Sequence, residues 1–180
     1  MTSEIDQLTQ QIAELKVKLS DLQSQVEPEK VSNYTFATGE TLLDLFGGRE
    51  ELIIVHNMGQ TCPYCTLWAD GLNGLHDHFV NRAAFVVVSP DSPDVQAKNS
   101  RERGWKFRMA SDASKEFTSA MGFWNSEDGW WPGMSAFKRS GDEIVRTGTT
   151  IFGPGDDFCS VWPAFDLLGG DKSWEPKTKY

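Results

Sequence analysis

Two cysteines separated by two residues are the strongest chemical signal in the chain. Cys62 and Cys65 lie in the stretch "MGQTCPYCTLWADG", which follows an apolar run, and the sequence of 180 residues contains three cysteines in total. A C-x-x-C pair at the start of a helix brings two sulfurs close enough to form a disulfide. The pair therefore predicts thiol-disulfide redox chemistry, with metal binding and simple packing as alternatives.

The expected position of the pair favours the redox interpretation. Unpaired amides at a helix N-terminus stabilise a thiolate, so we expect Cys62 to attack and Cys65, almost one turn further on, to resolve. Pro63 suits the first helical turn, where its missing amide proton would have had no partner. The residues thus predict one nucleophilic and one resolving cysteine.

A zinc site would need two further ligands. The other sulfur and imidazole groups are those of Cys159, His56, His76 and His78. Ten residues separate Cys65 from the H-x-H sequence, whose two histidines diverge on a helix, and this spacing does not match the usual zinc fingers. We therefore expect no metal. The remaining alternative is that the two thiols only pack as small apolar groups, and Cys159 is given no function.

The composition argues against several kinds of partner. The formal net charge is -9 and no Lys/Arg-rich run offsets it, so we expect neither nucleic acid nor a membrane as a partner. The N-terminal stretch "MTSEIDQLTQ" lacks the features of a signal peptide, and no run of about 18 apolar residues is present. A cytoplasmic location is the expectation, in agreement with an odd cysteine count.

The N-terminal segment carries a heptad pattern. Its apolar residues recur at alternating spacings of three and four: Ile5, Leu8, Ile12, Leu15, Leu19, Leu22 and Val26. This pattern predicts a coiled-coil helix that forms a homodimer through residues 5–26, or else a helix that packs on its own domain. Pro28 ends the helix. We therefore expect a heptad helix over 1–27 and a globular domain over 31–180.

The rest of the chain predicts an α/β fold. A βαβ unit carries the cysteines and is followed by an antiparallel ββα unit, which gives a mixed sheet with helices on both faces. Glycines interrupt the helix after the cysteines, and an irregular loop is expected over 122–133. The expected elements are strands over 34–37, 51–58 and 83–90, helices over 42–46, 67–79, 92–105 and 157–168, and a hairpin over 134–152.

Motif and element order together resemble known redox proteins. The sequence "TCPYC", with Pro63 and Tyr64 between the cysteines, is similar to the active site of glutaredoxins, and the element order resembles the thioredoxin fold. The stretches "VVVSPDSPDVQAKNSRERGWKFRMASDASKEF", "FKRSGDEIVRTGTTIFGPG" and "DLLGGDKSWEPK" resemble the predicted dithiol-disulfide oxidoreductases of domain-of-unknown-function family 899. This resemblance covers about residues 36–177. It implies a thioredoxin-like domain that uses the Cys62 and Cys65 pair.

The wider thioredoxin resemblance implies supporting roles for two residues. Thioredoxins keep a buried acid six residues before the first active cysteine, which corresponds here to His56. This histidine would take the proton of Cys65, unless it is a core histidine bonded to a backbone carbonyl. The cis proline of thioredoxins corresponds to Pro132, so a cis Trp131-Pro132 bond is expected, with an ordinary trans proline as the alternative.

The function predicted from the sequence is that of a thiol-disulfide oxidoreductase, an enzyme whose substrate is a disulfide. A thiol peroxidase is one alternative, although Gly59 occupies the place of a Thr in peroxiredoxin-like sites. A non-catalytic dimeric interaction module is another. No cofactor is expected, apart from glutathione as a candidate reductant. Asp70 and Asp91 are either proton carriers or, more simply, surface or capping residues.

Overall fold

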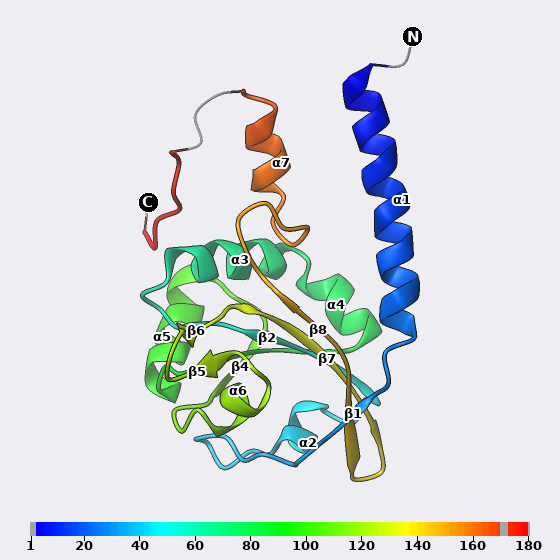
Figure 1. Cartoon of the computed structure of the whole chain (residues 1–180). Coiled ribbons are helices and arrows are strands. Elements are labelled where there is room, and N and C mark those ends of the chain that lie inside the picture. Colours follow the sequence, from blue (N-terminus) through cyan, green and yellow to red (C-terminus); the bar gives the residue numbers. More distant parts are fainter. Residues whose placement is uncertain (1–2, 170–172, 180) are drawn as a thin grey trace.

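A mixed six-stranded sheet forms the centre of the chain in a computed structural model that describes residues 3–169 and 173–179 (Figure 1). The strand order is β1-β8-β7-β2-β3-β4, in which β2, β3 and β4 are parallel and the other pairs are antiparallel. The elements in chain order are α1 (Glu4–Ser24), β1 (Glu29–Val31), α2 (Leu42–Leu45), β2 (Glu51–His56), α3 (Pro63–Gly74), α4 (His76–Arg82), β3 (Ala84–Ser89), α5 (Pro93–Arg103), β4 (Arg108–Ser111), α6 (Glu116–Ala120), β5 (Trp124–Asn125), β6 (Gly129–Trp130), β7 (Gly133–Ser140), β8 (Glu143–Ile151) and α7 (Val161–Asp166).

The two faces of the sheet carry separate apolar clusters because side chains alternate along each strand. In β2, Leu52 and Ile54 point into the cluster that includes residues of α2 and α6. Ile53 and Val55 point the other way, into the cluster that includes residues of α3 and α4. Figure 1 shows α3 and α4 on one side of the sheet and α2 and α6 on the other. The predicted α/β order, with helices on both faces, is confirmed.

The helices beside the predicted site begin and end where the sequence indicates. The long helix after the cysteines is interrupted as expected, since α3 ends at Gly74 and α4 begins at His76. The side chain of Ser92 accepts a hydrogen bond from the Val95 amide at the start of α5, and Gly104 ends that helix with a φ of 68°. Local capping therefore determines both boundaries of α5.

The hairpin expected over 134–152 is present as β7 and β8, which turn after Ser140. The loop expected over 122–133 instead contains the short β5–β6 hairpin. The Asn125 carboxamide oxygen accepts hydrogen bonds from the amides of Glu127 and Asp128, at 2.8 and 2.7 Å, and closes this turn. A local polar side chain therefore fixes this turn, which an apolar period would not reveal.

Two predicted elements are shorter than expected. The closing helix expected over 157–168 is limited to α7, because the Asp156 carboxylate accepts the amides of Gly153 and Phe158 and holds the preceding segment as a turn. The strand expected over 34–37 is reduced to an isolated bridge between Thr35 and Thr41.

Two strands of the central sheet were not predicted. These are the short edge strands β1 and β4, which pair with β8 and β3. Their own residues carry no strand pattern, so only the pairing identifies them as strands. The segment "DLLGGDKSWEPK" of the family resemblance lies partly outside the described residues, because these omit 170–172.

Helix α1 forms as predicted and leaves its apolar stripe open. The helix begins with a capping box between Ser3 and Asp6, and its N-terminal end extends beyond the sheet (Figure 1). The seven apolar heptad residues are 52 to 76 % exposed in the isolated chain. Among the described residues, no helix is both long enough and apolar enough to cross a bilayer.

Candidate active site

Cys62 and Cys65 lie together at the N-terminus of α3, where the sequence placed them. Cys62 is the N-cap residue, and its sulfur accepts a hydrogen bond from the Cys65 amide at 3.1 Å. Pro63 occupies the first turn, as expected. All three cysteines, including Cys159, are free thiols. The helix terminus therefore directs amide hydrogen atoms at the sulfur of Cys62.

The surroundings give the two sulfurs opposite acidities. The hydrogen bond from the Cys65 thiol is the main cause that lowers the pKa of Cys62 to about 7, and the amides of Cys65 and Tyr64 add to it against the effect of burial. The same hydrogen bond, together with burial, raises the pKa of Cys65. Cys62 is half-buried and Cys65 is 2 % exposed. At neutral pH about half of the Cys62 thiol is therefore ionised and it is reachable, while Cys65 stays protonated.

The loop before α3 forms hydrogen bonds to Cys65. The Met58 amide donates a hydrogen bond to the Cys65 sulfur at 3.4 Å, and the Asn57 carboxamide donates to the Cys65 carbonyl at 3.4 Å. The Gly59 amide in turn donates to the side-chain oxygen of Asn57 at 2.8 Å. Asn57 is buried. Sequence reasoning missed Asn57 and Met58 because the strand expected over 51–58 included them. The strand ends at His56, and a position directly after a buried strand is the signal that could have identified them.

Asp91 lies on the other side of the same loop. Its carboxylate accepts hydrogen bonds from the Gln60 amide at 2.9 Å and from the Ser89 hydroxyl at 3.3 Å. Burial raises the pKa of Asp91, and the negative charge of Asp91 adds to the causes that raise the pKa of Cys65. Asp91 is thus a loop anchor close enough to influence the resolving cysteine, which goes beyond the surface role considered for it.

Asp70 is engaged on the far side of α3. Its carboxylate accepts hydrogen bonds from Arg103 and from the Trp105 indole, the latter at 2.8 Å. This arrangement ties α3 to the end of α5 and gives Asp70 a structural role.

His56 lies on the face of the sheet opposite to α3. The alternation of β2 places it with Ile54, where its ring stacks on Phe123 at a centroid distance of 3.8 Å and its Nε2 lies 3.0 Å from Ser135 Oγ. Burial, aided by the positive charge of Arg146, lowers the pKa of His56 to about 3. No hydrogen bond of the described residues joins it to Cys65. The structure therefore favours the core-histidine alternative, with a serine hydroxyl as partner.

The predicted cis bond before Pro132 is wrong, because no peptide bond of the described residues is cis. The flanking hydrogen bonds favour an extended chain: Trp131 donates its amide to Phe123, and the Pro132 carbonyl accepts the amide of Phe152 at 2.8 Å. Pro132 is buried directly before β7, whose first residue pairs with His56. Pro132 therefore lies at the end of the sheet where β2 leads into the cysteine loop.

Tyr64 extends the site toward an aromatic group on the side of α7. Its ring lies 6.1 Å from that of Trp68 and 6.2 Å from that of Trp162. Within residues 3–169 and 173–179, no group of three His, Cys, Asp or Glu side chains is arranged to bind a metal ion.

A cysteine pair that caps a helix beside a mixed α/β sheet defines a thioredoxin-fold protein with a C-x-x-C site. The chain belongs to the family described as "Bacterial protein of unknown function (DUF899)", whose family model matches residues 3–175. No curated protein matches the chain.

Solved structures show the same fold. Reduced Prx3 from Vibrio vulnificus matches with a TM-score of 0.60 at 16% identity, over 80% of this chain and 99% of that chain. Peroxiredoxin Q from Xanthomonas campestris matches with a TM-score of 0.59 at 18% identity, over 76% and 90% of the two chains. A putative thioredoxin reductase from Burkholderia cenocepacia matches with a TM-score of 0.53 at 19% identity, over 65% and 73%. These matches establish the thioredoxin-like fold.

Proposed function

We propose that the protein is a thiol-disulfide oxidoreductase in which Cys62 attacks and Cys65 resolves. The observation that supports this best is the hydrogen bonding of the Cys62 sulfur by the thiol and amide of Cys65, which lowers the pKa of Cys62 to about 7. A thiolate at neutral pH beside a buried, protonated thiol is the arrangement that dithiol exchange requires.

The reaction has two exchange steps. The Cys62 thiolate attacks one sulfur of a substrate disulfide, so that a new S–S bond forms, the substrate S–S bond breaks and one substrate thiolate leaves. Cys62 is then no longer a thiolate that holds the Cys65 proton, so Cys65 attacks the Cys62 sulfur, the mixed S–S bond breaks, and the second substrate thiolate leaves with the Cys65 proton. The substrate gains two electrons, and the protein is left with a Cys62–Cys65 disulfide.

A thiol reductant must regenerate the dithiol, and we propose a low-molecular-weight thiol such as glutathione for this role. The reverse exchange then returns both electrons to the protein. The expected cytoplasmic location, with its reducing thiol pool, agrees with such a donor. Substrate, reductant and location stay predictions.

The test is a redox titration with a matched cysteine control. We expect Cys62 and Cys65 to lose two alkylation sites reversibly in glutathione buffers, with a midpoint between about -270 and -120 mV. Cys62→Ser is expected to abolish disulfide reduction, whereas Cys159→Ser, which removes a thiol outside the pair, retains it. Turnover by Cys62→Ser at the wild-type rate would show that the mechanism is wrong.

A thiol peroxidase is the second candidate, and the peroxiredoxin fold of the matching structures favours it. In that reaction the Cys62 thiolate takes one oxygen from a peroxide to give a sulfenic acid and an alcohol or water, and Cys65 then displaces water to form the disulfide. Stopped-flow peroxide consumption by Cys62 no faster than that of a free thiol would eliminate this candidate.

We also propose that α1 forms a homodimer through residues 5–26, since its apolar stripe stays open on the isolated chain. If this helix carries the biology as a non-catalytic interaction module, removal of residues 1–27 would abolish partner binding. A redox enzyme is expected to keep disulfide reduction as the shortened, monomeric chain.

A further inference from the structure

We propose that the polar cavity beside the cysteine loop binds one arm of a small disulfide of the amino-acid type, one that bears both carboxylate and ammonium groups. The proposal rests on the proposed function, because the sulfur of such a ligand would be the target of Cys62. It assigns the substrate class that the cysteine chemistry alone leaves open.

The cavity adjoins the backbone of the cysteine loop. It has a volume of about 390 Å³ and is lined by Gly59 and Gln60 of the loop and by Thr66 of α3. The Cys62 amide donates a hydrogen bond to the Gly59 carbonyl at 3.1 Å, and the Thr66 hydroxyl donates to the Cys62 carbonyl at 3.0 Å. Two lining residues thus contact the backbone of the nucleophile. The volume falls within the range of small-molecule sites, roughly 300–1,000 Å³.

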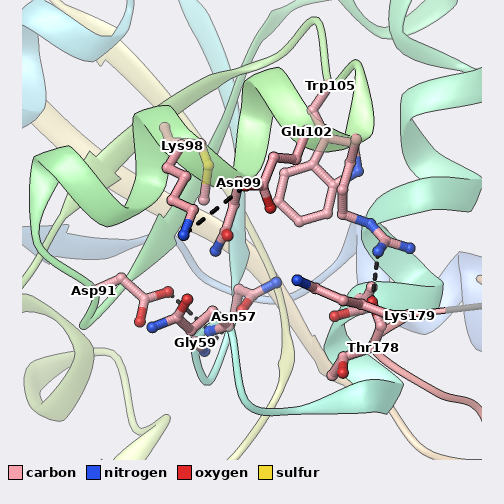
Figure 2. A pocket seen from close by; sticks show the side chains of 13 residues that line it. Asn57, Gly59, Asp91, Lys98, Asn99, Glu102, Trp105, Thr178 and Lys179 are labelled. Atoms are coloured by element: carbon pink, nitrogen blue, oxygen red, sulfur yellow. Dashed lines mark hydrogen bonds and ion pairs between the residues drawn. The ribbon is translucent and has the colours of Figure 1, made fainter.

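The lining carries charges of both signs. Figure 2 shows the amino groups of Lys98 and Lys179 directed into the cavity from different sides, with Asp91 at its floor. One carboxylate oxygen of Asp91 accepts the Gln60 amide and the Ser89 hydroxyl, while no hydrogen bond within the described chain occupies the other oxygen. This second oxygen is an acceptor available to an ammonium group.

The cationic side chains are only weakly engaged with the protein. Lys98 is 3.9 Å from Glu102, the outer limit of an ion pair, and its side chain is 65% exposed. Lys179 forms no ion pair with the part of the chain that the structure describes. Both amino groups can therefore turn toward a carboxylate without first breaking a strong contact.

The wall opposite the loop is held in place. Trp105 donates its indole N–H to Asp70 at 2.8 Å, and Arg103 pairs with the same carboxylate. Arg103 also donates to the Thr178 carbonyl at 2.7 Å, so the C-terminal segment that carries Lys179 is fastened to α5 (Figure 2). The cavity is thus bordered by a fixed aromatic side chain and an anchored C-terminal segment.

These features favour a ligand with both charge signs. A dicarboxylate would bring negative charge toward Asp91, and a diamine would bring positive charge toward the two lysines, so each would meet repulsion at one wall. The amide group of Asn99 adds a donor and an acceptor suited to a peptide bond. A disulfide-linked amino acid or short peptide meets all of these requirements.

The test compares four disulfides with the full-length protein, which is reduced beforehand and freed of excess thiol so that Cys62 and Cys65 supply both electrons; the second-order rate constant of this single turnover is taken as kcat/KM. Glutathione disulfide carries both signs, cystamine only ammonium groups, 3,3′-dithiodipropionate only carboxylates, and bis(2-hydroxyethyl) disulfide no charge. We expect kcat/KM to be highest for glutathione disulfide. In the Lys98→Gln, Lys179→Gln double variant, its preference over the uncharged disulfide should fall about fivefold, the size expected for two solvent-exposed ion pairs.

Lys138→Gln is the matched control, since it removes a cation of β7 that lies outside this cavity, and it should keep the preference. Equal kcat/KM values for the four disulfides, or an unchanged preference in the double lysine variant, would overturn the proposed site while leaving the oxidoreductase intact. If no disulfide is reduced, the proposed function fails. Calorimetric binding of glutathione disulfide to Cys62→Ser, Cys65→Ser protein then decides the site: lysine-dependent binding supports it, and absence of binding refutes it.

Discussion

The acidity of Cys62 is predicted to depend on one neighbouring thiol, and Cys65→Ala tests this directly. The hydrogen bond from the Cys65 thiol is the main cause that lowers the pKa of Cys62 from its ordinary value of 9.0 to about 7. Without that donor, the pKa is expected to rise toward 9.0. The amides of Cys65 and Tyr64 persist in the variant, so full recovery of the ordinary value sets the upper limit.

The largest expected change in the reaction rate of Cys62 follows from two quantities, the fraction of thiolate and the nucleophilicity of that thiolate. At pH 7 the thiolate fraction would fall from about one half to about one hundredth, a loss of about fiftyfold. The more basic thiolate is intrinsically more reactive by about eightfold, given a Brønsted coefficient of about 0.4–0.5. The variant would therefore react about sixfold more slowly at pH 7. At pH 10, where Cys62 is ionised in the wild type and in the variant, the variant would react about eightfold faster.

The assay is stopped-flow reaction with 4,4′-dithiodipyridine between pH 6 and 10, with the first phase assigned to Cys62. A Cys159→Ala background leaves one accessible reporter. Cys65→Ser is the matched control, because its hydroxyl still donates to the thiolate and should retain much of the lowered pKa. The two rate profiles of wild type and Cys65→Ala should cross at about pH 8, where the larger thiolate fraction of the wild type is balanced by the greater reactivity of the variant's thiolate. Profiles that never cross, or equal midpoints for Cys65→Ala and Cys65→Ser, would refute the reasoning.

Three further predictions concern stability and assembly. The pKa of His56 is lowered to about 3 in the folded protein, so its contribution to stability is present above about pH 6.5 and is lost as the pH falls toward 3. Between pH 7 and pH 5, the free energy of unfolding should therefore fall by about 2 kcal/mol because of this residue. Urea titrations of His56→Phe should lack that loss, whereas those of His78→Gln, an exposed control, should keep it. Gly133→Ala would place a Cβ 2.3 Å from both Phe123 and the Thr150 carbonyl, and should cost about 1–3 kcal/mol in urea unfolding, while Gly148→Ala, whose Cβ meets nothing within 4 Å, should not. Ile12→Lys should convert the expected dimer to a monomer in sedimentation velocity; a monomeric wild type would contradict the coiled coil.

Local signals explain why much of the fold was predictable. The caps at Ser92 and Gly104 act within one helical turn, and the turn at Gly141 acts within a hairpin, so the sequence alone contains the information. The strands β1 and β4 are three and four residues long and form only by pairing with β8 and β3. No local pattern marks such strands, because their stability comes from distant segments.

The candidate site was predictable where it is local. Cys62, Pro63 and Cys65 act on each other within one turn of α3, and their spacing was sufficient. Asp91 reaches the cysteine loop only because β3 pairs in parallel with β2, a contact between segments about thirty residues apart. Its role therefore had to come from the structure.

His56 shows the opposite case, in which an available local rule was not applied. The period of two along β2 places residue 56 on the face of residues 52 and 54, away from α3. Counting positions from the cysteine motif identified the corresponding position but gave no information about the direction of its side chain.

The unequal burial of the two cysteines makes the chemistry one-sided. Because only Cys62 is accessible, every covalent complex with a substrate must begin on that sulfur. A chain that lacks Cys65 cannot release its bound partner by internal attack, so the mixed disulfide should persist after the first exchange. The protein can therefore serve as its own affinity reagent: mass spectrometry of the disulfide-linked adducts formed by Cys65→Ala in cells would identify physiological substrates from the covalent bond they leave behind.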